Sequence, residues 1–296
     1  MQRVMALFLA SLDGVASPAT LTWYRRRLSS LVEFVGASCK AADVSTDDLR
    51  RWRGSVCKRG LSVHTLHGYV RAARRLFKWA EDEGKIGKSP ARRLELPRLP
   101  RGQVRGIPPE DVDKILAAAS SPRDLALCWF LYSTACRVGG LVGLTLADLD
   151  LDRGRARVCE KGNKTRSVFL MPEAVEALRA WLPGRAVTAG DPQHALKGQG
   201  HVFLGQRGPL TTSGVYQILK RLAARAGVPA GWNPHNWRHR RLRDLQAAGM
   251  PLGLVSQIAG HASVEVTAGI YGWLSPDELQ REFGKYGMNG STGGAK

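Results

Sequence analysis

The sequence has few cysteines, and no two of them have the spacing of a metal or redox site. The chain contains five cysteines in 296 residues and no CxxC pair. We therefore expect neither a disulfide framework nor a zinc site, and free thiols fit a reducing, cytoplasmic compartment. The sequence also has no internal repeats, and no segment approaches the ~20 apolar residues of a membrane span.

The first 18 residues of the chain loosely imitate a signal peptide. They combine an arginine, a short apolar run and small residues. A basic protein with free thiols makes little sense outside the cell, so we favour a helix instead. Its expected apolar face carries Val4, Leu7, Phe8 and Leu12.

Acidic residues are scarce relative to basic ones. The chain has 25 Asp and Glu against 44 Lys and Arg, a net charge of +19 and a pI near 10.4. A GC-rich genome would favour Arg over Lys, but it would not produce this excess of positive charge. A polyanionic partner explains the excess, and nucleic acid is the expected one.

Length and composition predict two folded domains. Hydrophobic residues make up 44% of the chain and charged residues 23%, which suits buried cores. We expect a helical domain over 1–90, a basic, proline-rich linker over 91–107 and a second domain over 108–296. The last ten residues are rich in glycine and form a flexible tail in this interpretation.

The first domain is predicted to consist of helices. Ser17 and Pro18 begin a helix to about residue 35, and Ser62 begins the longest helix, which ends near Gly84. One face of the longest helix is apolar and the opposite face carries only positive or imidazole side chains. We expect that row to contact DNA: His64, Arg71, Arg75 and Lys78.

The second domain combines helices with one clear β-hairpin. The segments "GRARVCE" and "TRSVFLM" alternate like strands and are separated by "KGNK", whose Gly and Asn suit a turn. "HVFL", residues 201–204, is a weaker third strand. Further helices are expected near 212–226, 234–248, 251–259, 263–270 and 276–286.

Four segments in this order resemble the motifs of the tyrosine recombinase (phage integrase) family: "TACRVGGLVGLTLADLD", "CEKGNKTRSVFL", "HNWRH" and "AGHASVEVTAGIYGW". The resemblance covers the whole second domain, and the first domain is similar to the family's core DNA-binding domain. It implies a mainly α N-terminal core-binding domain and an α+β catalytic domain with a small antiparallel hairpin. The implied catalytic set is Arg137, Lys161, His235, Arg238, His261 and the nucleophile Tyr271.

These residue types suit strand cleavage at phosphorus. Two guanidiniums, Arg137 and Arg238, can stabilise the charge that builds on the phosphate oxygens. His235 lies three residues before Arg238, so both share a helix face and can meet one phosphate, helped by free N–H groups at that helix start. A tyrosine nucleophile conserves the energy of the broken bond in a phosphotyrosine.

The resemblance also implies the remaining roles. The hairpin lysine protonates the leaving 5′ oxygen, His235 orients or accepts the tyrosine proton, and His261 binds a phosphate oxygen. Lys161 fits the lysine position better than its competitor Lys164. No metal or cofactor is expected, because no carboxylate cluster accompanies these bases.

One departure from the family pattern concerns the support of Arg137. The family usually has an acidic residue three positions after the first arginine, where this chain has Gly140. The support must come from elsewhere, with Asp148 as a candidate, or is missing. Outside the catalytic set, we expect contacts to DNA from the linker, the hairpin and the basic helix near 240: Arg101, Arg105, Lys164 and Arg240.

These observations predict a site-specific DNA recombinase that acts through a 3′-phosphotyrosyl intermediate. The departures from the motifs and the Arg-rich composition favour a compact phage or mobile-element integrase, although chromosome-dimer-resolving recombinases have about this length and a transposon recombinase is a further alternative. A type IB topoisomerase shares the chemistry, and a catalytically silent DNA-binding regulator is the alternative from another class. The expected partners are double-stranded DNA and three further copies of the chain, with an excisionase or other directionality factor as a candidate.

Overall fold

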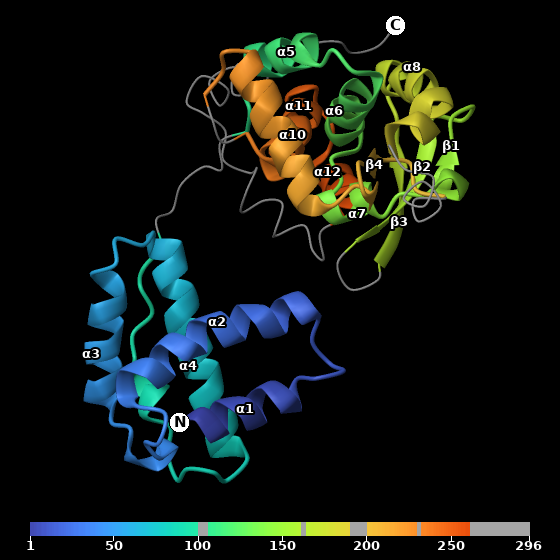
Figure 1. Ribbon diagram of the computed structural model, residues 1–296. Coiled ribbons are helices and arrows are strands. Elements are labelled where there is room, and N and C mark those ends of the chain that lie inside the picture. Colours follow the sequence, from blue (N-terminus) through green and yellow to red (C-terminus); the bar gives the residue numbers. More distant parts are fainter. Residues whose placement is uncertain (100–105, 161–163, 190–199, 230–231, 261–296) are drawn as a thin grey trace, which may run out of the picture. The chain divides into compact units, whose positions relative to one another are not determined.

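Helices form most of the fold, and a small antiparallel sheet lies in the C-terminal half (Figure 1). The computed structural model describes residues 1–99, 106–160, 164–189, 200–229 and 232–260. The chain divides into two compact units, Met1–Gly102 and Gln103–Lys296. The predicted fold class is therefore confirmed.

The first unit contains these helices and 3-10 turns: α1 (Gln2–Ser11), α2 (Pro18–Val35), η1 (Ala41–Asp43), α3 (Thr46–Cys57), α4 (Val63–Asp82) and η2 (Pro90–Arg93). The predicted helix starts are confirmed by their caps. Ser17 Oγ accepts a hydrogen bond from the N–H of Thr20 at 3.2 Å, and Ser62 Oγ accepts one from Thr65 at 3.2 Å. These bonds satisfy N–H groups that the first turn of a helix leaves without a partner.

The core of this unit includes one face of α4. The predicted apolar face of α4 is buried, with Val70, Leu76 and Phe77 fully inaccessible. In α1 the predicted face was partly wrong, because Leu7 is 41% exposed whereas Met5 and Phe8 are buried. The buried side is shifted by one position along the helix, so Leu7 falls beside the core.

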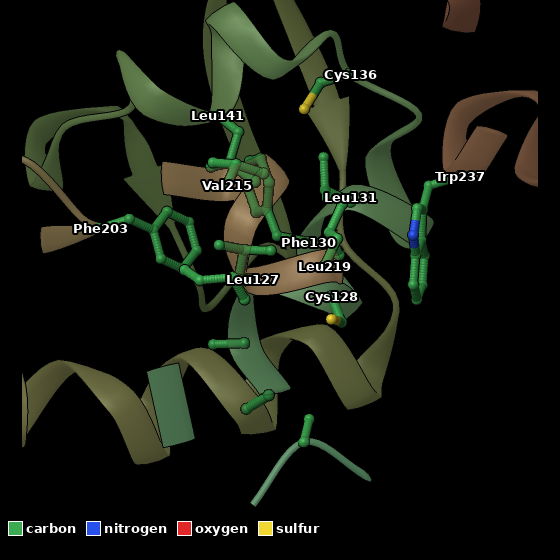
Figure 2. Packing of buried hydrophobic residues seen from close by; sticks show 14 of the residues in the cluster. Leu127, Cys128, Phe130, Leu131, Cys136, Leu141, Phe203, Val215, Leu219 and Trp237 are labelled. Carbon is green, nitrogen blue, oxygen red and sulfur yellow. The ribbon is translucent and has the colours of Figure 1, made fainter. Parts of the chain in front are cut away.

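The second unit contains the elements α5 (Pro109–Ala118), α6 (Pro122–Thr134), α7 (Val138–Val142), η3 (Leu146–Asp148), β1 (Leu149–Asp150), β2 (Arg155–Glu160), β3 (Lys164–Phe169), α8 (Pro172–Trp181), η4 (Leu182–Ala189), β4 (Leu204–Gly205), β5 (Gly208–Pro209), α10 (Thr212–Arg225), α11 (Pro234–Ala247) and α12 (Leu252–Ala259). Its core surrounds α6. Figure 2 shows side chains of α6 packed among residues from α7, α10 and the segment before β4, with labels that include Leu127, Phe130, Leu141, Phe203, Val215 and Leu219.

The hairpin forms as predicted, with β2 and β3 antiparallel and Val158 opposite Arg166. Side chains of β2 alternate strictly, so Ala156, Val158 and Glu160 are buried. The third strand of this sheet is β1, which was not predicted from the sequence. The "HVFL" segment does not join it, and only Leu204 and Gly205 form a strand, paired with β5.

Two thiols lie inside this unit. Burial raises the pKa of Cys128, and it raises the pKa of Cys136 to about 11. Both thiols therefore stay protonated at neutral pH and are poor nucleophiles. No helix among the residues that the structure describes combines the length and apolar character of a membrane span.

Candidate active site

A sharp turn after α6 positions Arg137. Ala135 follows the last residue of α6 and adopts a left-handed conformation, φ 49° and ψ 27°, and Arg137 is the N-cap residue of α7. Within the described ranges, Ala135 is the only residue other than glycine with a positive φ, and this conformation costs roughly 1–2 kcal/mol. The turn leaves the Arg137 side chain 33% exposed, so it can reach a ligand.

The carboxylate of Glu160, at the end of β2, binds Arg137 twice. The backbone N–H of Arg137 donates to Glu160 Oε1 at 2.7 Å, and the guanidinium Nη1 forms an ion pair with Oε2. Burial raises the pKa of Glu160, but the bond from the Arg137 N–H and the charges of Arg166 and Arg137 outweigh it and hold this pKa below its ordinary value. Glu160 is therefore ionised at neutral pH.

The expectation that Asp148 supports Arg137 was wrong. Its carboxylate instead accepts the N–H of Thr145 at 3.2 Å and pairs with Arg157 at 3.1 Å. Neither Glu160 nor its second partner Arg166 was predicted from the sequence. The signal was present, because strand alternation from Ala156 places Glu160 on the buried face.

The helix α11 carries the next two candidates and begins with a capping box. Asn233 Oδ1 accepts the N–H groups of His235 at 2.9 Å and Asn236 at 3.3 Å, and Asn236 Oδ1 accepts the N–H of Asn233 at 3.1 Å. The expectation that a phosphate binds free N–H groups at this helix start is therefore wrong for His235 and Asn236, whose N–H groups are already bonded. Any anion there must be bound through side chains.

Arg238 links two distant segments. It is 3% exposed, its Nη1 donates to the carbonyl oxygen of Ala135 at 2.6 Å, and its Nη2 donates to that of Ala259. Ala135 lies two residues before Arg137, and Ala259 is the last residue of α12. The guanidinium thus connects the Arg137 turn to the end of α12, where Gly260 adopts a left-handed conformation with φ 61°.

His235 lies within the field of both arginines. Its side chain is exposed, but partial desolvation by the surrounding protein, followed by the positive charges of Arg238 and Arg137, lowers the pKa of His235. The imidazole is consequently neutral at pH 7 and can accept a proton. The structure therefore brings His235, Arg137 and Arg238 into one electrostatic cluster.

Five predicted site residues lie outside the described residues: Lys161, His261, Tyr271, Arg101 and Arg105. Their roles remain predictions. Two of them directly follow a described residue in the sequence: Lys161 follows Glu160, and His261 follows Gly260.

The predicted DNA-contacting side chains differ in their surroundings. His64, Arg71 and Arg75 on α4 are exposed. Lys78 is exposed too, but Asp82 at 2.6 Å and Glu81 at 3.9 Å neutralise its charge. Their roles in DNA binding remain predictions.

In the catalytic unit, Lys164 is exposed at the start of β3. Arg240 binds Asp244 through two nitrogens and its side chain is 18% exposed. Nearby, Arg241 stacks 5.4 Å from the ring centre of Tyr132. Two positive charges of α11 that follow Arg238 thus have partners within the protein. Within the described part of the chain, no group of three His, Cys, Asp or Glu side chains is placed to hold a metal ion.

Comparisons with known proteins match both units to one family. The Phage integrase family model matches residues 105–277, and the model of the "Phage integrase, N-terminal SAM-like domain" matches residues 7–84. Proteins named Tyrosine recombinase XerC are similar along most of their length. The one from Chromohalobacter salexigens is 34% identical over 90% of this chain and 90% of its own, and the one from Corynebacterium glutamicum 31% identical over 94% and 89%.

Solved structures share the fold. The Tn1549 transposon integrase in complex with a circular intermediate DNA has a TM-score of 0.76 at 20% identity, covering 96% of this chain and 99% of that one. The XerH site-specific recombinase bound to palindromic difH substrate has a TM-score of 0.72 at 21% identity, with 92% and 80% covered. The fold, the cluster of Arg137, His235 and Arg238 and the sequence relatives agree: the chain belongs to the phage integrase family and is a tyrosine recombinase, an enzyme that breaks and rejoins DNA strands.

Proposed function

We propose that this chain is a site-specific recombinase that resolves chromosome dimers, acting through a 3′-phosphotyrosyl intermediate on Tyr271. The observation that carries the chemical part is the cluster of Arg137, Arg238 and a neutral His235. Two guanidiniums fixed by protein contacts can stabilise a phosphorane-like transition state without rearranging when charge develops.

In this mechanism Arg137 and Arg238 bind the scissile phosphate, and His235 accepts the proton of the Tyr271 hydroxyl. Tyr271 attacks phosphorus, and the bond to the 5′ oxygen breaks. Lys161 donates a proton to that oxygen, and His261 binds a non-bridging oxygen of the phosphate. Rejoining reverses these steps with a 5′ hydroxyl of another strand as the nucleophile.

The biological role is supported by the curated relatives. Those quoted above are named Tyrosine recombinase XerC and align over nearly the full length of this chain. This favours the chromosome-dimer-resolving alternative, whereas the phage or mobile-element integrase favoured from the sequence alone has no specific support. Lambda and Tn1549 integrases share the fold at only 15% and 20% identity, which carries no argument about the role.

DNA is the proposed partner of both units. Among the described residues α4 presents Arg71 and Arg75 to solvent, and the chain carries +19 net charge. We propose that residues 1–90 bind the core site and that four protomers assemble on two duplexes for strand exchange. Solved relatives bound to DNA, such as XerH with its difH substrate, support this partner.

The test is a trap for covalent complexes. The wild-type chain and Tyr271→Phe are mixed with nicked duplexes prepared from host chromosomal DNA and from resident mobile elements. Protein-linked 3′ ends are recovered under denaturing conditions and sequenced. Tyr216→Phe is the matched control, because Tyr216 is exposed on α10 and lies outside the cluster.

The proposal expects adducts from the wild type and the control but not from Tyr271→Phe, with their sequences at one chromosomal site. Adducts at the ends of a mobile element would instead restore the integrase interpretation. Retained DNA binding without any adduct from the wild type would contradict the catalytic proposal and favour the DNA-binding regulator.

A further inference from the structure

A buried carboxylate lies between two arginines directly behind the candidate active site. Glu160 keeps only 4% of its side chain exposed, yet it carries a full negative charge. It pairs with Arg137 as described above and with Arg166 of β3, whose Nη2 lies 3.2 Å from Oε1. A buried charge is stable only when it is paired and hydrogen-bonded, so these three side chains form one unit.

The contacts to Arg137 restrict that residue at both ends. Glu160 accepts the backbone N–H with one oxygen and the guanidinium with the other. The main chain and the head of the side chain are therefore held by one rigid carboxylate. A long side chain held in this way loses little further freedom when it binds a phosphate, which favours catalysis by pre-organisation.

Gly140 makes room for this carboxylate. A Cβ atom at position 140 would lie 3.2 Å from Val158 Cβ, closer than most such contacts, and 3.4 Å from Glu160 Cγ, at the lower edge of ordinary van der Waals contact. Position 140 is where the family pattern has an acidic residue and this chain has none. An acidic side chain at position 140 would therefore extend from a point that lies next to the side chain of Glu160.

The same carboxylate also reaches the end of α12. Arg166 donates from Nη1 to the carbonyl oxygen of Ile258 at 2.6 Å. A Cβ at Gly260 would lie 2.9 Å from Arg166 Cδ and 3.7 Å from Glu160 Oε2. The Glu160–Arg166 pair therefore packs beneath the turn that leads into His261.

We propose that Glu160, on the β-hairpin, is the positioning residue of Arg137. It provides the support that Gly140 does not provide. It fixes the direction of the guanidinium toward the phosphate, and through Arg166 it ties this arrangement to the end of α12. The inference rests on the proposed recombinase function, and it concerns residues that the family resemblance did not single out.

The first test replaces the charge and keeps the shape. Glu160→Gln is compared with wild type in single-turnover cleavage of a nicked duplex that carries the trapped site, alongside the dissociation constant for the uncleaved duplex. We expect the cleavage rate to fall by about 10- to 100-fold, by analogy with the loss of hydrogen-bond partners that orient metal ligands. DNA affinity should stay within about threefold because phosphate contacts elsewhere remain.

The control is Asp148→Asn, which alters another arginine-paired carboxylate of the same unit, away from the cluster. It should cleave at the wild-type rate. A Glu160→Gln rate within twofold of wild type, or a loss of rate matched by an equal loss of DNA affinity, overturns the proposal.

A double-mutant cycle separates positioning from a general loss of structure. In an Arg137→Ala background, Glu160→Gln should change the residual cleavage rate by less than about twofold, because the group that it positions is gone. An undiminished effect in that background would mean that Glu160 acts on the whole fold and would overturn the proposal.

Exchanging the residues at positions 140 and 160 gives the test most specific to this geometry. Gly140→Glu alone should lower cleavage, because its side chain meets Glu160 and Val158, and Glu160→Gly alone should lower it by removing the carboxylate. The double substitution returns an acid to the same space and should cleave faster than either single variant. A double variant that is slower than both contradicts the proposed equivalence of the two positions.

These outcomes differ from failure of the proposed function. If the wild type forms no adduct, the recombinase proposal itself fails. If the wild type forms adducts and Glu160→Gln does so at the same rate, only the positioning role fails.

Discussion

Arg238 donates hydrogen bonds to two backbone carbonyls, those of Ala135 and Ala259, and is almost fully buried. A guanidinium carries five N–H donors in a fixed planar fork, and two of its nitrogens bind these carbonyls. The residue therefore combines a structural link with a proposed catalytic charge. A substitution of Arg238 should therefore lower both the stability of the fold and the cleavage rate, and the two effects must be measured separately.

We predict that Arg238→Ala lowers the cleavage rate by at least about 100-fold, as expected for the loss of a transition-state donor. DNA affinity should stay within about threefold. The free energy of unfolding should fall by about 2–4 kcal/mol, because two buried carbonyls lose their donor. Single-turnover cleavage, DNA binding and urea denaturation measure the three quantities.

Arg179→Ala is the control, since this arginine is exposed on α8 and its ion pair is with exposed Asp152. It should leave all three quantities nearly unchanged. Cleavage at the wild-type rate by Arg238→Ala would show that Arg238 does not take part in catalysis.

His235 gives a pH-dependent prediction at the same scale. Partial desolvation and the charges of Arg238 and Arg137 lower its pKa. Since the folded pKa lies below the unfolded value, protonation favours unfolding, and this contribution destabilises the fold as pH drops below about 6.5. Arg137→Gln removes one of the charges and should raise the pKa of His235.

NMR titration of the imidazole protons, assigned with a His235→Gln variant, measures this shift. Lys220→Gln is the control, because Lys220 lies on α10 and is not one of the charges that lower the pKa of His235. An unchanged His235 pKa in Arg137→Gln would show that the two side chains are electrostatically separate.

At the scale of elements, α4 carries a row of positive charge that is not uniform. Arg75 is exposed, whereas Lys78 is paired with Asp82 and Glu81. Replacing Arg75 by Ala should reduce the slope of log affinity against log salt by about one, the loss of one phosphate contact. Lys78→Ala should change the slope less, because its charge is already compensated.

Fluorescence anisotropy with a labelled duplex over a range of salt concentrations measures both slopes. Arg50→Ala on α3, which pairs with Asp47, is a control of similar size. Equal slopes for wild type and Arg75→Ala would mean that this face of α4 does not meet the phosphate backbone.

The hairpin gives a second prediction at this scale, through Glu160. Its pKa is depressed in the folded chain, so its contribution to stability is fully present above about pH 4.5 and is lost as pH falls below that value. The free energy of unfolding should therefore decrease more steeply with acidification in wild type than in Glu160→Gln. Denaturation series between pH 3.5 and 6 test this, and parallel curves would contradict it.

The elements also show what sequence patterns can predict. The period of α4 placed Val70, Leu76 and Phe77 in the core, and strand alternation placed the hairpin correctly. Such patterns succeed because burial of one face repeats with the geometry of the element itself. The apolar face of α1 failed at Leu7, where two adjacent faces are both hydrophobic and only the neighbouring helices decide which is buried.

Contacts between distant segments were harder to predict. The motifs identified Arg137, His235 and Arg238, but they gave no indication that Arg238 binds the carbonyls of Ala135 and Ala259. Asp148 was chosen as the support of Arg137 because it is near in sequence, whereas Glu160 at the end of β2 contacts Arg137 from 23 residues further along the chain. A pairing of this kind depends on tertiary geometry, which one sequence does not encode as a periodic signal.

At the scale of the whole molecule, each unit has a hydrophobic core of its own. Fully buried Trp52 belongs to the core of the first unit, and Phe130 to that of the second. We predict that the fragment 1–99 folds alone and shows one cooperative thermal transition by circular dichroism. It should bind duplex DNA weakly and with strong salt dependence, because positive charge supplies non-specific affinity.

Trp52→Ala in the same fragment is the comparison. Loss of this side chain should cost about 3–5 kcal/mol, enough to unfold a small domain of ordinary stability. A fragment 1–99 without a cooperative transition would show that the first unit depends on the rest of the chain.

The tight fit between Gly140 and Glu160 also has an evolutionary consequence. A Cβ at position 140 would lie 3.2 Å from Val158 Cβ and 3.4 Å from Glu160 Cγ, so we expect substitutions at positions 140 and 160 to be epistatic, with acids at both positions competing for one place beside Arg137. A lineage that moves its acid from one position to the other must pass through a sequence with both acids or with neither. Exchange of this residue between lineages is therefore constrained by the order of the two mutations as well as by the final pair.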